Sequence, residues 1–225
     1  MESKSVALDG PAGAGKSTLA KMAAKHFGLI YVDTGALYRC IGLHALRNNV
    51  SSKDFEGVIK LLPEIKLEMK YDGEGNQRMI LCDADVTDDI RMPLVSNYAS
   101  DVSAMPPVRA FLLSMQREMA ASYNVIMDGR DIGTVVLPGA GLKVFLTAEL
   151  GARAKRRYDE LREKNIETSY DDVLKDMAIR DKNVSERETA PLKAAEGSVL
   201  LDTTNMNLEE SFAALCEIME GAITP

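Results

Sequence analysis

The stretch GPAGAGKST, residues 10–18, constrains this chain more than any other feature of its sequence. It satisfies G-x-x-x-x-G-K-[ST], and it follows an apolar run, VALD at 6–9, and precedes an expected helix, LAKMAAKHF at 19–27. The glycines let successive backbone N–H groups converge on phosphate oxygens, and the helix directs its positive end at the same anion. A strand, a glycine-rich loop and a helix in this order predict a site for a nucleoside triphosphate.

The positions of this loop have distinct expected tasks. Lys16 bridges the β- and γ-phosphates, and Ser17 supplies a hydroxyl to a Mg²⁺ ion that the nucleotide carries. Asp9, directly before the loop, is expected to order it. The residues expected to contact the nucleotide are Gly10, Pro11, Ala12, Gly13, Ala14, Gly15, Lys16, Ser17 and Thr18.

The remaining pattern predicts an α/β P-loop fold of three layers with a five-stranded parallel sheet. Short apolar runs recur at 6–8, 29–32, 125–127, 143–146 and 198–201, with intervals long enough for helical crossovers. Helical periodicity is clearest at 107–122 and 208–219. We expect a single domain, 1–225, with an acceptor-binding excursion at 34–122, an inserted antiparallel hairpin at 64–92 and a helical lid at 149–190, restarted by a capping box at 169–172.

Composition excludes several classes of protein. The formal net charge of −7 argues against duplex DNA or an anionic membrane as the partner, although arginines can still gather in one cleft. Three dispersed cysteines without a CxxC pair suggest neither disulfides nor a zinc site, and no apolar run is long enough for a signal peptide or a membrane span. We therefore expect a soluble, cytoplasmic protein, a monomer, with small-molecule nucleotides as partners and no nucleic acid or membrane.

Two reaction classes fit a phosphate loop. A GTPase-like switch needs an N-K-x-D element to recognise its base, and this chain has none. A small kinase needs a second anion site, for which bidentate guanidinium groups suit a monophosphate better than lysine does. The candidates for that site are Arg39, Arg109, Arg130, Arg180 and Arg187.

The motifs GPAGAGKST, DTGALYR, NYASDVSAMPPVR, DGRDIGTVVLP and RD…R…APL follow one another along the chain. In this order and over nearly the whole length, the sequence resembles the bacterial cytidylate kinase family. The resemblance implies phosphoryl transfer from ATP to CMP or dCMP. It also implies a set of acceptor-binding residues: Thr34, Tyr38, Arg39, Ser100, Arg109, Gly129, Arg130, Asp131, Arg180 and Arg187.

By the same resemblance, Arg39, Arg130, Arg180 and Arg187 surround the acceptor phosphate, and Ser100, Arg109, Asp131 and Arg187 meet the cytosine. Lys16, Arg130, Arg180 and Arg187 are the expected catalytic residues. A carboxylate accepts a hydrogen bond from the exocyclic amine of cytosine and repels the carbonyl that uracil has in its place. Asp131 is therefore expected to read the base, while Gly129 lets its turn bend.

Three questions stay open in the sequence. Asp128 either acts on Mg²⁺, usually through water, or caps its turn. Arg153, Arg156 and Arg157 share a helix face, and we expect Arg153 and Arg157 to contact ATP from a closing lid, the alternative being a solvated face partly neutralised by Glu149 and Glu160. Val184 stands where the family places an aspartate that helps to hold the acceptor sugar, which predicts weakened discrimination between CMP and dCMP or raised Michaelis constants for both.

Two alternative functions are compatible with the residues. The first is a nucleoside monophosphate kinase for another base, most plausibly of the UMP/CMP type. The second is a nucleotide-dependent switch or binding protein in which the inserted hairpin recruits a partner.

Overall fold

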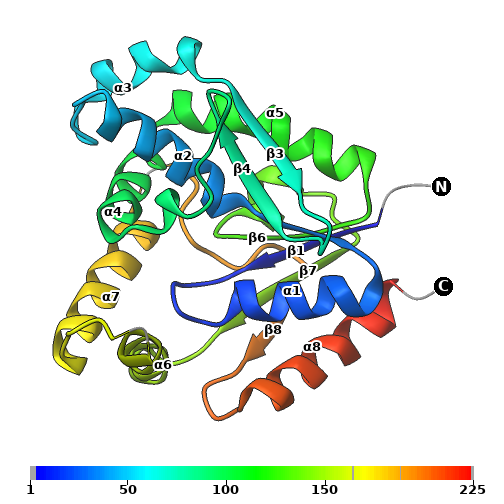
Figure 1. The fold of residues 1–225 in the computed structure, drawn as a ribbon. Helices are drawn as coiled ribbons and strands as arrows, with labels where there is room; N and C mark the ends of the chain where they lie inside the picture. Colours follow the sequence, from blue (N-terminus) through cyan, green and yellow to red (C-terminus); the bar gives the residue numbers. More distant parts are fainter. Residues whose placement is uncertain (1–3, 164, 188, 224–225) are drawn as a thin grey trace. The chain divides into compact units, whose positions relative to one another are not determined.

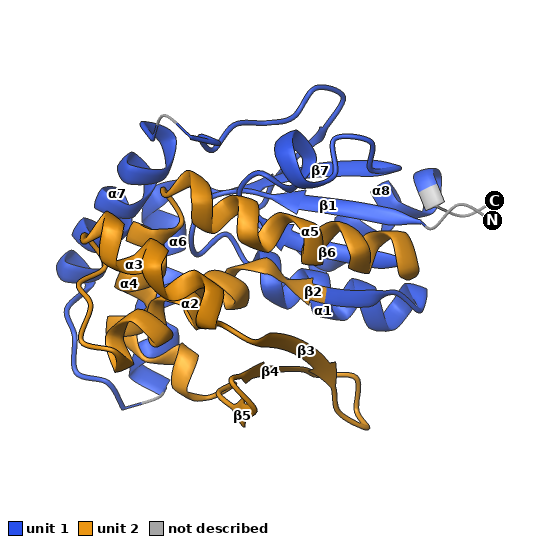
Figure 2. Cartoon of the chain, turned by 90° about the horizontal axis from the view of Figure 1, so that it is seen from above, with its two compact units in different colours: residues 1–31, 123–225 blue, residues 32–122 orange. Residues whose placement is uncertain are grey.

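The structure is a computed structural model that describes residues 4–163, 165–187 and 189–223. The chain divides into two compact units, Met1–Tyr31 with Tyr123–Pro225 and Val32–Ser122, which Figure 2 shows in different colours.

The first unit is built on a parallel sheet. Among the described residues this sheet has five strands in the order β2-β6-β1-β7-β8. β1 pairs in parallel with both β6 and β7, and β7 pairs in parallel with β8 (Figure 1). The strands are β1 (Ser5–Asp9), β2 (Ile30–Asp33, which runs into the second unit), β6 (Val125–Gly129), β7 (Leu142–Thr147) and β8 (Val199–Asp202).

The helical elements of this unit lie between or after these strands. They are α1 (Lys16–Phe27), the short π-helical turn η3 (Ile132–Val136), α6 (Leu150–Glu163), α7 (Tyr170–Ser185) and α8 (Leu208–Ile223). The core of the unit lies between the sheet and the helices α1 and α8, with Leu8, Ile126 and Leu146 almost fully buried. The carboxyl ends of parallel strands meet at one sheet edge, and the pairing of Asp9 with Gly129 brings the ends of β1 and β6 level there.

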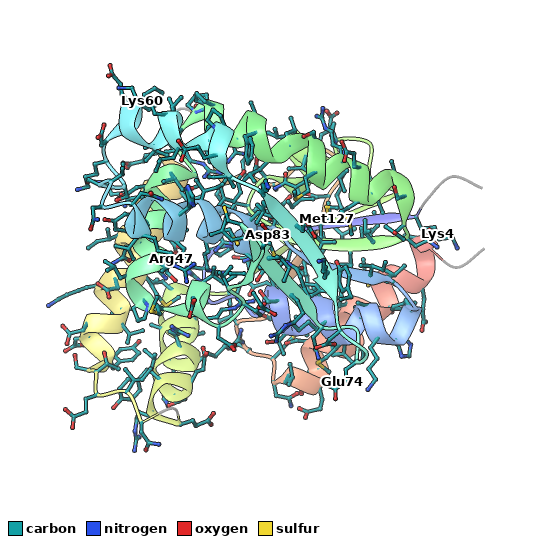
Figure 3. The ribbon with its side chains drawn as sticks, turned by 45° about the horizontal axis from the view of Figure 1, so that its top comes forward. Lys4, Arg47, Lys60, Glu74, Asp83 and Met127 are labelled. Atoms are coloured by element: carbon teal, nitrogen blue, oxygen red, sulfur yellow. The ribbon has the colours of Figure 1, made fainter. Side chains whose placement is uncertain are left out.

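The second unit is mostly helical, with a small sheet of its own. Its elements are α2 (Thr34–Arg47), α3 (Phe55–Leu61), η1 (Leu62–Glu64), β3 (Leu67–Tyr71), β4 (Gln77–Leu81), β5 (Ala84–Asp85), η2 (Asp89–Arg91), α4 (Pro93–Val102) and α5 (Pro106–Ser122). β3 and β4 pair antiparallel, and β4 pairs antiparallel with β5. In Figure 3, Glu74 lies at the tip of the β3–β4 turn, where Asp72 accepts hydrogen bonds from two backbone N–H groups. A buried cluster that includes Leu37, Ile41 and Leu112 forms the core.

The predicted α/β class is confirmed, with its five-stranded parallel sheet and its small antiparallel insertion. The predicted helices at 107–122 and 208–219 correspond to α5 and α8. Ser169 of the predicted capping box is the N-cap of α7: its hydroxyl accepts a hydrogen bond from the backbone N–H of Asp172 at 3.1 Å and donates one to the Asp172 carboxylate at 2.6 Å. The short strand β5 and the helices α3 and α4 were not predicted.

In the described part of the chain, no helix combines the length and the hydropathy that crossing a membrane would require.

Candidate active site

The phosphate loop joins β1 to α1 in the first unit. Gly10, Gly13 and Gly15 have φ angles of 151°, 70° and 89°, so the backbone turns through conformations that other residues rarely adopt. Lys16, Ser17 and Thr18 form the first turn of α1, and Gly15 is its N-cap. The loop predicted from the sequence therefore lies where a helix N-terminus can receive an anion.

Gly10 makes the closest backbone approach in this loop. A Cβ atom at this position would lie 1.9 Å from the carbonyl oxygen of Leu146 in β7. Only glycine fits, because backbone rather than a movable side chain fills the space. The phosphate loop is thus fixed against the central sheet at its first residue.

Lys16 lies under the loop and is 5% exposed. Its Nζ donates a hydrogen bond to the carbonyl of Pro11 at 2.7 Å. Burial, and then the positive charge of Arg130, lower the pKa of Lys16, although Asp128 and Asp9 act in the opposite direction. A bound anion beside Lys16 would therefore stabilise its charged form, as expected of a lysine that binds phosphate.

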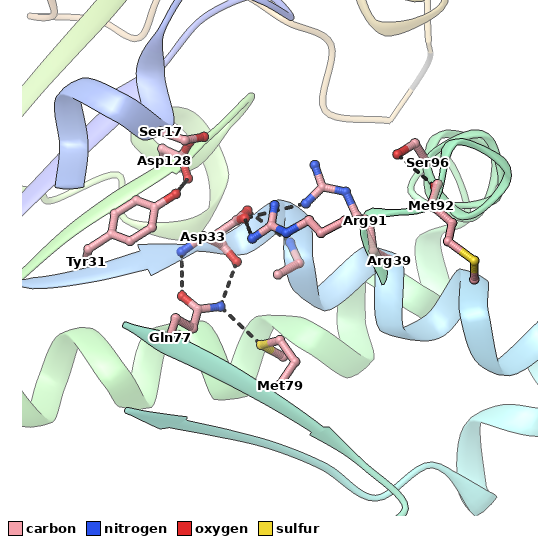
Figure 4. A network of polar contacts seen from close by, with 11 residues as sticks. Ser17, Tyr31, Asp33, Arg39, Gln77, Met79, Arg91, Met92, Ser96 and Asp128 are labelled. Atoms are coloured by element: carbon pink, nitrogen blue, oxygen red, sulfur yellow. Dashed lines mark hydrogen bonds and ion pairs between the residues drawn. The ribbon is translucent and has the colours of Figure 1, made fainter. Parts of the chain in front are cut away.

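Ser17 and Asp128 form the oxygen-rich part of the same loop region. The Ser17 hydroxyl donates to Asp128 Oδ2 at 2.6 Å, and the Tyr31 hydroxyl donates to Asp128 Oδ1 at 3.1 Å (Figure 4). Hydroxyl and carboxylate oxygens are the ligands that Mg²⁺ prefers, so these residues fit the ion. Among the described residues, no group of three or more His, Cys, Asp or Glu side chains is arranged to hold a metal.

Asp9 binds the turn that carries the candidate base-reading residue. Its two carboxylate oxygens accept hydrogen bonds from the backbone N–H groups of Ile132 and Gly133, both at 2.7 Å. Burial outweighs these bonds and raises the pKa of Asp9 to about 6. The sequence led us to expect that Asp9 orders the phosphate loop; the structure shows its side chain ordering the η3 turn instead.

The raised pKa of Asp9 predicts a pH dependence of stability. Because folding disfavours the ionised carboxylate, the contribution of Asp9 to the free energy of unfolding is greatest below the unfolded pKa of 3.8 and falls as the pH rises through about 6. The full loss amounts to about 3 kcal/mol. Urea unfolding of the wild type and of Asp9→Asn at several pH values checks this: their difference in stability should shift against the wild type as the pH rises, and a constant difference would refute it.

The DGRD segment begins at the end of β6, and its charged residues Arg130 and Asp131 have different partners. Arg130 Nη1 donates to the carbonyl of Gly129 at 3.0 Å. Asp131 is 5% exposed, and its Oδ1 lies 3.7 Å from Nη2 of Arg187, whose Nε donates to the carbonyl of Ala190 at 2.6 Å. The structure thus brings together Asp131 and Arg187, two of the residues expected to meet the cytosine.

The three arginines of α6 have different partners. Arg153 is buried and donates to the carbonyls of Ala148 and Ala12 and to the Asp181 carboxylate, at 2.7, 2.9 and 2.7 Å. All three of its nitrogens are thereby engaged, one of them with the phosphate loop itself. A contact between Arg153 and ATP stays a prediction, and it would require an exchange of these partners.

Arg156 and Arg157 belong to the helix face for which the alternative interpretation was a solvated surface partly neutralised by Glu149 and Glu160. Arg156 donates to the carbonyls of Thr203 and Met206. Arg157 pairs with Glu160, one of those two glutamates, at 2.7 Å. A contact between Arg157 and ATP stays a prediction. Arg180 lies half-buried on α7, and Val184 follows it one turn later.

The second unit holds the other residues predicted for the acceptor. Arg109 is buried at the start of α5, donates to the carbonyl of Ser103 at 3.2 Å and lies 5.7 Å from the centre of the Tyr38 ring. The structure therefore brings Tyr38 and Arg109 together. Thr34 is the first residue of α2, and Ser100 lies on α4.

Asp33 organises the beginning of α2. Its Oδ1 accepts from the backbone N–H of Ala36 at 3.0 Å, as an N-cap does, and its Oδ2 lies 3.5 Å from Arg39 Nη1 and 3.1 Å from Arg91 Nη2 (Figure 4). Arg91 and Gln77, which also contacts Asp33, were missed, since nothing in the local pattern of the insertion marks them.

Known proteins resemble this chain over most of its length. The family model described as "Cytidylate kinase" matches residues 6–221. A cytidylate kinase from Caldicellulosiruptor saccharolyticus is 47% identical over 99% of this chain and 98% of its own length. One from Caldanaerobacter subterraneus is 49% identical over 91% of this chain and 89% of its own length. A solved structure of an uncharacterized protein from Eubacterium ventriosum is similar in fold alone, with a TM-score of 0.52, 11% identity and 99% of each chain covered.

Proposed function

The chain belongs to the cytidylate kinase family, and from this premise we propose that it transfers the γ-phosphoryl group of ATP to CMP and dCMP. The products are CDP or dCDP and ADP. The observation that carries the proposal is a complete phosphate loop in the same unit as a buried carboxylate and guanidinium, Asp131 and Arg187, at a distance of 3.7 Å. The first group serves the donor and the second the acceptor.

The donor side depends on the phosphate loop. Backbone N–H groups of residues 10–18 receive the β- and γ-phosphates, and Lys16 exchanges the Pro11 carbonyl for a phosphate oxygen. Ser17 and Asp128 would hold Mg²⁺, directly or through water. When bound, the ion neutralises charge that develops on the β- and γ-phosphates.

On the acceptor side, the residues position a group that is already nucleophilic. The acceptor phosphate is ionised, so no general base is required, and alignment alone can lower the barrier by about 7–11 kcal/mol. We assign the phosphate to Arg39, Arg130, Arg180 and Arg187. We assign the cytosine edge to Ser100, Arg109, Asp131 and Arg187, which provide donors for its acceptors and one carboxylate for its amine.

The remaining assignments belong to the same proposal. The donor is ATP with Mg²⁺, the partners are small nucleotides, and the protein acts as a monomer in the cytoplasm. The lid residues Arg153 and Arg157 are proposed to approach the donor phosphates, where exclusion of water would suppress hydrolysis.

An acceptor panel tests the proposal. ADP formation from ATP and Mg²⁺ is measured with CMP, dCMP, UMP, AMP and GMP. The proposal expects the highest kcat/KM with CMP and dCMP. Equal or higher values with UMP would favour the UMP/CMP-type alternative, and ATP hydrolysis that no monophosphate stimulates would favour the switch.

Asp131→Asn is expected to reduce base discrimination. The amide presents a donor to the cytosine amine and can instead satisfy the uracil carbonyl. Loss of a buried charge-assisted pairing is worth about 1–3 kcal/mol, so the ratio of kcat/KM for CMP to that for UMP should fall about 10- to 100-fold. Asp159→Asn, on the exposed part of α6, is the matched control. An unchanged ratio in Asp131→Asn would show that another residue reads the amine.

Val184→Asp is expected to strengthen recognition of the acceptor sugar. Val184 is half-buried near the end of α7, and its carbonyl accepts a hydrogen bond from the backbone N–H of Leu192 at 3.1 Å. An aspartate adds hydrogen-bond acceptors for a sugar hydroxyl without disturbing that backbone contact. Steady-state kinetics should then show a lower KM for at least one acceptor or a larger difference between CMP and dCMP. Kinetics equal to those of the wild type for both acceptors would contradict the prediction.

A further inference from the structure

The end of β2 is held by the inserted segment of the second unit. Gln77 begins β4, and its side-chain amide binds both backbone polar groups of Asp33: Oε1 accepts from the Asp33 N–H at 2.8 Å, and Nε2 donates to the Asp33 carbonyl at 3.3 Å (Figure 4). β2 is an edge strand of its sheet, so these backbone groups need partners from elsewhere. One side chain supplies both, much as a neighbouring strand would.

A second residue of the inserted segment holds the Asp33 side chain. Arg91, the last residue of η2, reaches Asp33 Oδ2 at 3.1 Å, and Arg39 reaches the same oxygen at 3.5 Å. Burial raises the pKa of Asp33, but the guanidinium groups of Arg39 and Arg91 outweigh it and leave the pKa below its ordinary value. The carboxylate therefore stays ionised and keeps both arginines in place.

Asp33 in turn fixes the direction of Arg39. As the N-cap it sets where α2 begins, and Arg39 lies on the second turn of that helix. A Cβ at Gly35 would lie 3.1 Å from Asp33 Oδ1 and 3.6 Å from Arg39 Nη1, so the guanidinium folds back over Gly35 towards the carboxylate. The orientation of Arg39 thus depends on how firmly Asp33 is held.

We propose that Gln77 and Arg91 are positioning residues for the acceptor phosphate, which they serve by holding Asp33 and, through it, Arg39. This gives the inserted segment a task in phosphoryl transfer. The inference rests on the proposed function, since it takes Arg39 to bind the phosphate of CMP. It does not require either positioning residue to touch the substrate.

Two other contacts of the same segment provide matched controls. Arg47 of α2 pairs with Asp89, two residues before Arg91 in η2, at 2.6 Å. Arg78, next to Gln77, pairs with Asp85 of β5 at 2.8 Å. Both pairs are partly exposed, and neither involves Asp33. If the segment needed only to be attached or folded, loss of these pairs should have the same effect as loss of Gln77 or Arg91.

The experiment compares steady-state kinetics and thermal unfolding of the full chain in seven variants. These are Gln77→Glu, Arg91→Ala, Arg91→Lys, Arg39→Ala, the double variant of Arg39→Ala with Arg91→Ala, and the controls Arg47→Ala and Arg78→Ala. Gln77→Glu keeps the shape of the side chain but replaces the donor to the Asp33 carbonyl with a second acceptor. Arg91→Lys keeps a positive charge within reach of Asp33.

The proposal expects a specific split between kinetic constants. In Gln77→Glu and Arg91→Ala, the KM for CMP rises about tenfold while the KM for ATP changes less than about twofold. Arg91→Lys recovers most of the loss, and both controls behave as the wild type. With Arg39 already replaced, Arg91→Ala adds less than about twofold, because the residue through which it acts is gone.

Several results would overturn it. If the wild type turns over CMP and both Gln77→Glu and Arg91→Ala have the same KM for CMP as the wild type, the inference is refuted. The proposed function then stays intact. If the fold-increases in KM for CMP of Arg39→Ala and Arg91→Ala multiply in the double variant, Arg91 acts independently of Arg39. If Arg47→Ala and Arg78→Ala raise the KM for CMP as much as Gln77→Glu and Arg91→Ala do, the segment has only a structural role. A wild type without CMP turnover refutes the proposed function and this inference with it.

Discussion

Replacement of Lys16 by methionine is expected to lower kcat by a factor of about 10³ or more without destabilising the fold. The Lys16 Nζ lies inside the phosphate loop, 2.7 Å from the carbonyl oxygen of Pro11. From this position its ammonium can contact the phosphoryl group during transfer. Methionine keeps the length and the apolar part of the side chain and removes the charge. The transition state then loses a fixed positive charge in a site of low dielectric constant.

Stability is expected to respond in the opposite direction. Burial and the neighbouring Arg130 lower the pKa of Lys16, which means that its charge is unfavourable in the folded chain before nucleotide binds. Removing the charge should therefore leave the midpoint of thermal unfolding unchanged or raise it, in spite of the lost hydrogen bond to Pro11. Such a combination is typical of active sites in which charge is retained for function.

Lys25→Met is the matched control for this experiment. Lys25 is an exposed lysine in the last turn of the same helix, α1, and is expected to leave kcat within about twofold of the wild type, as surface substitutions usually do. Single-turnover kinetics and thermal unfolding of both variants give the comparison. A Lys16→Met protein with nearly wild-type kcat would refute the assigned role, and so would one whose activity is lost only because it unfolds.

Gly10→Ala is expected to prevent the chain from folding properly, or to lower the free energy of unfolding by more than about 3 kcal/mol. The new Cβ would lie 1.9 Å from the Leu146 carbonyl oxygen, and the φ of 151° is itself unfavourable for alanine. Because β1 is the central strand of the described sheet, relief of the clash would displace β7 or the phosphate loop. Nucleotide binding should be lost together with stability.

Gly73→Ala provides the control for Gly10→Ala. Gly73 lies in the β3–β4 turn, where an added Cβ meets nothing within 4 Å. Chemical denaturation of the two variants should show a large loss of stability for Gly10→Ala and a change of less than about 0.5 kcal/mol for Gly73→Ala. Similar values for the two would contradict the account of the loop.

The sequence predicted features that local pattern determines. The phosphate loop depends on glycines and a lysine at fixed spacing, and the N-cap at Ser169 depends on residues that are neighbours in the chain, so both could be predicted from local sequence. The five strands followed from short apolar runs. Asp131 and Arg187 were grouped through the family resemblance, and the structure places them together.

Features that depend on distant parts of the chain could not be predicted in this way. The partner of Arg153 in the phosphate loop, Ala12, is a backbone carbonyl, which leaves no signal in the sequence. The role of Asp9 depends on the parallel pairing of β1 with β6, which brings the η3 turn to its carboxylate. Gln77 contacts Asp33 through the folded hairpin, and the two residues are distant in the sequence. No local sequence pattern therefore predicts their contact.

Transfer of label from ATP tests the central claim most directly. The wild-type protein is incubated with Mg²⁺ and ATP labelled in the γ-phosphate, with and without CMP, and the label is followed into CDP and into inorganic phosphate. Direct transfer between two bound nucleotides predicts one labelled CDP for each ADP formed, and almost no free phosphate in either reaction. Label released mainly as inorganic phosphate, at a rate that does not depend on CMP, would contradict the account.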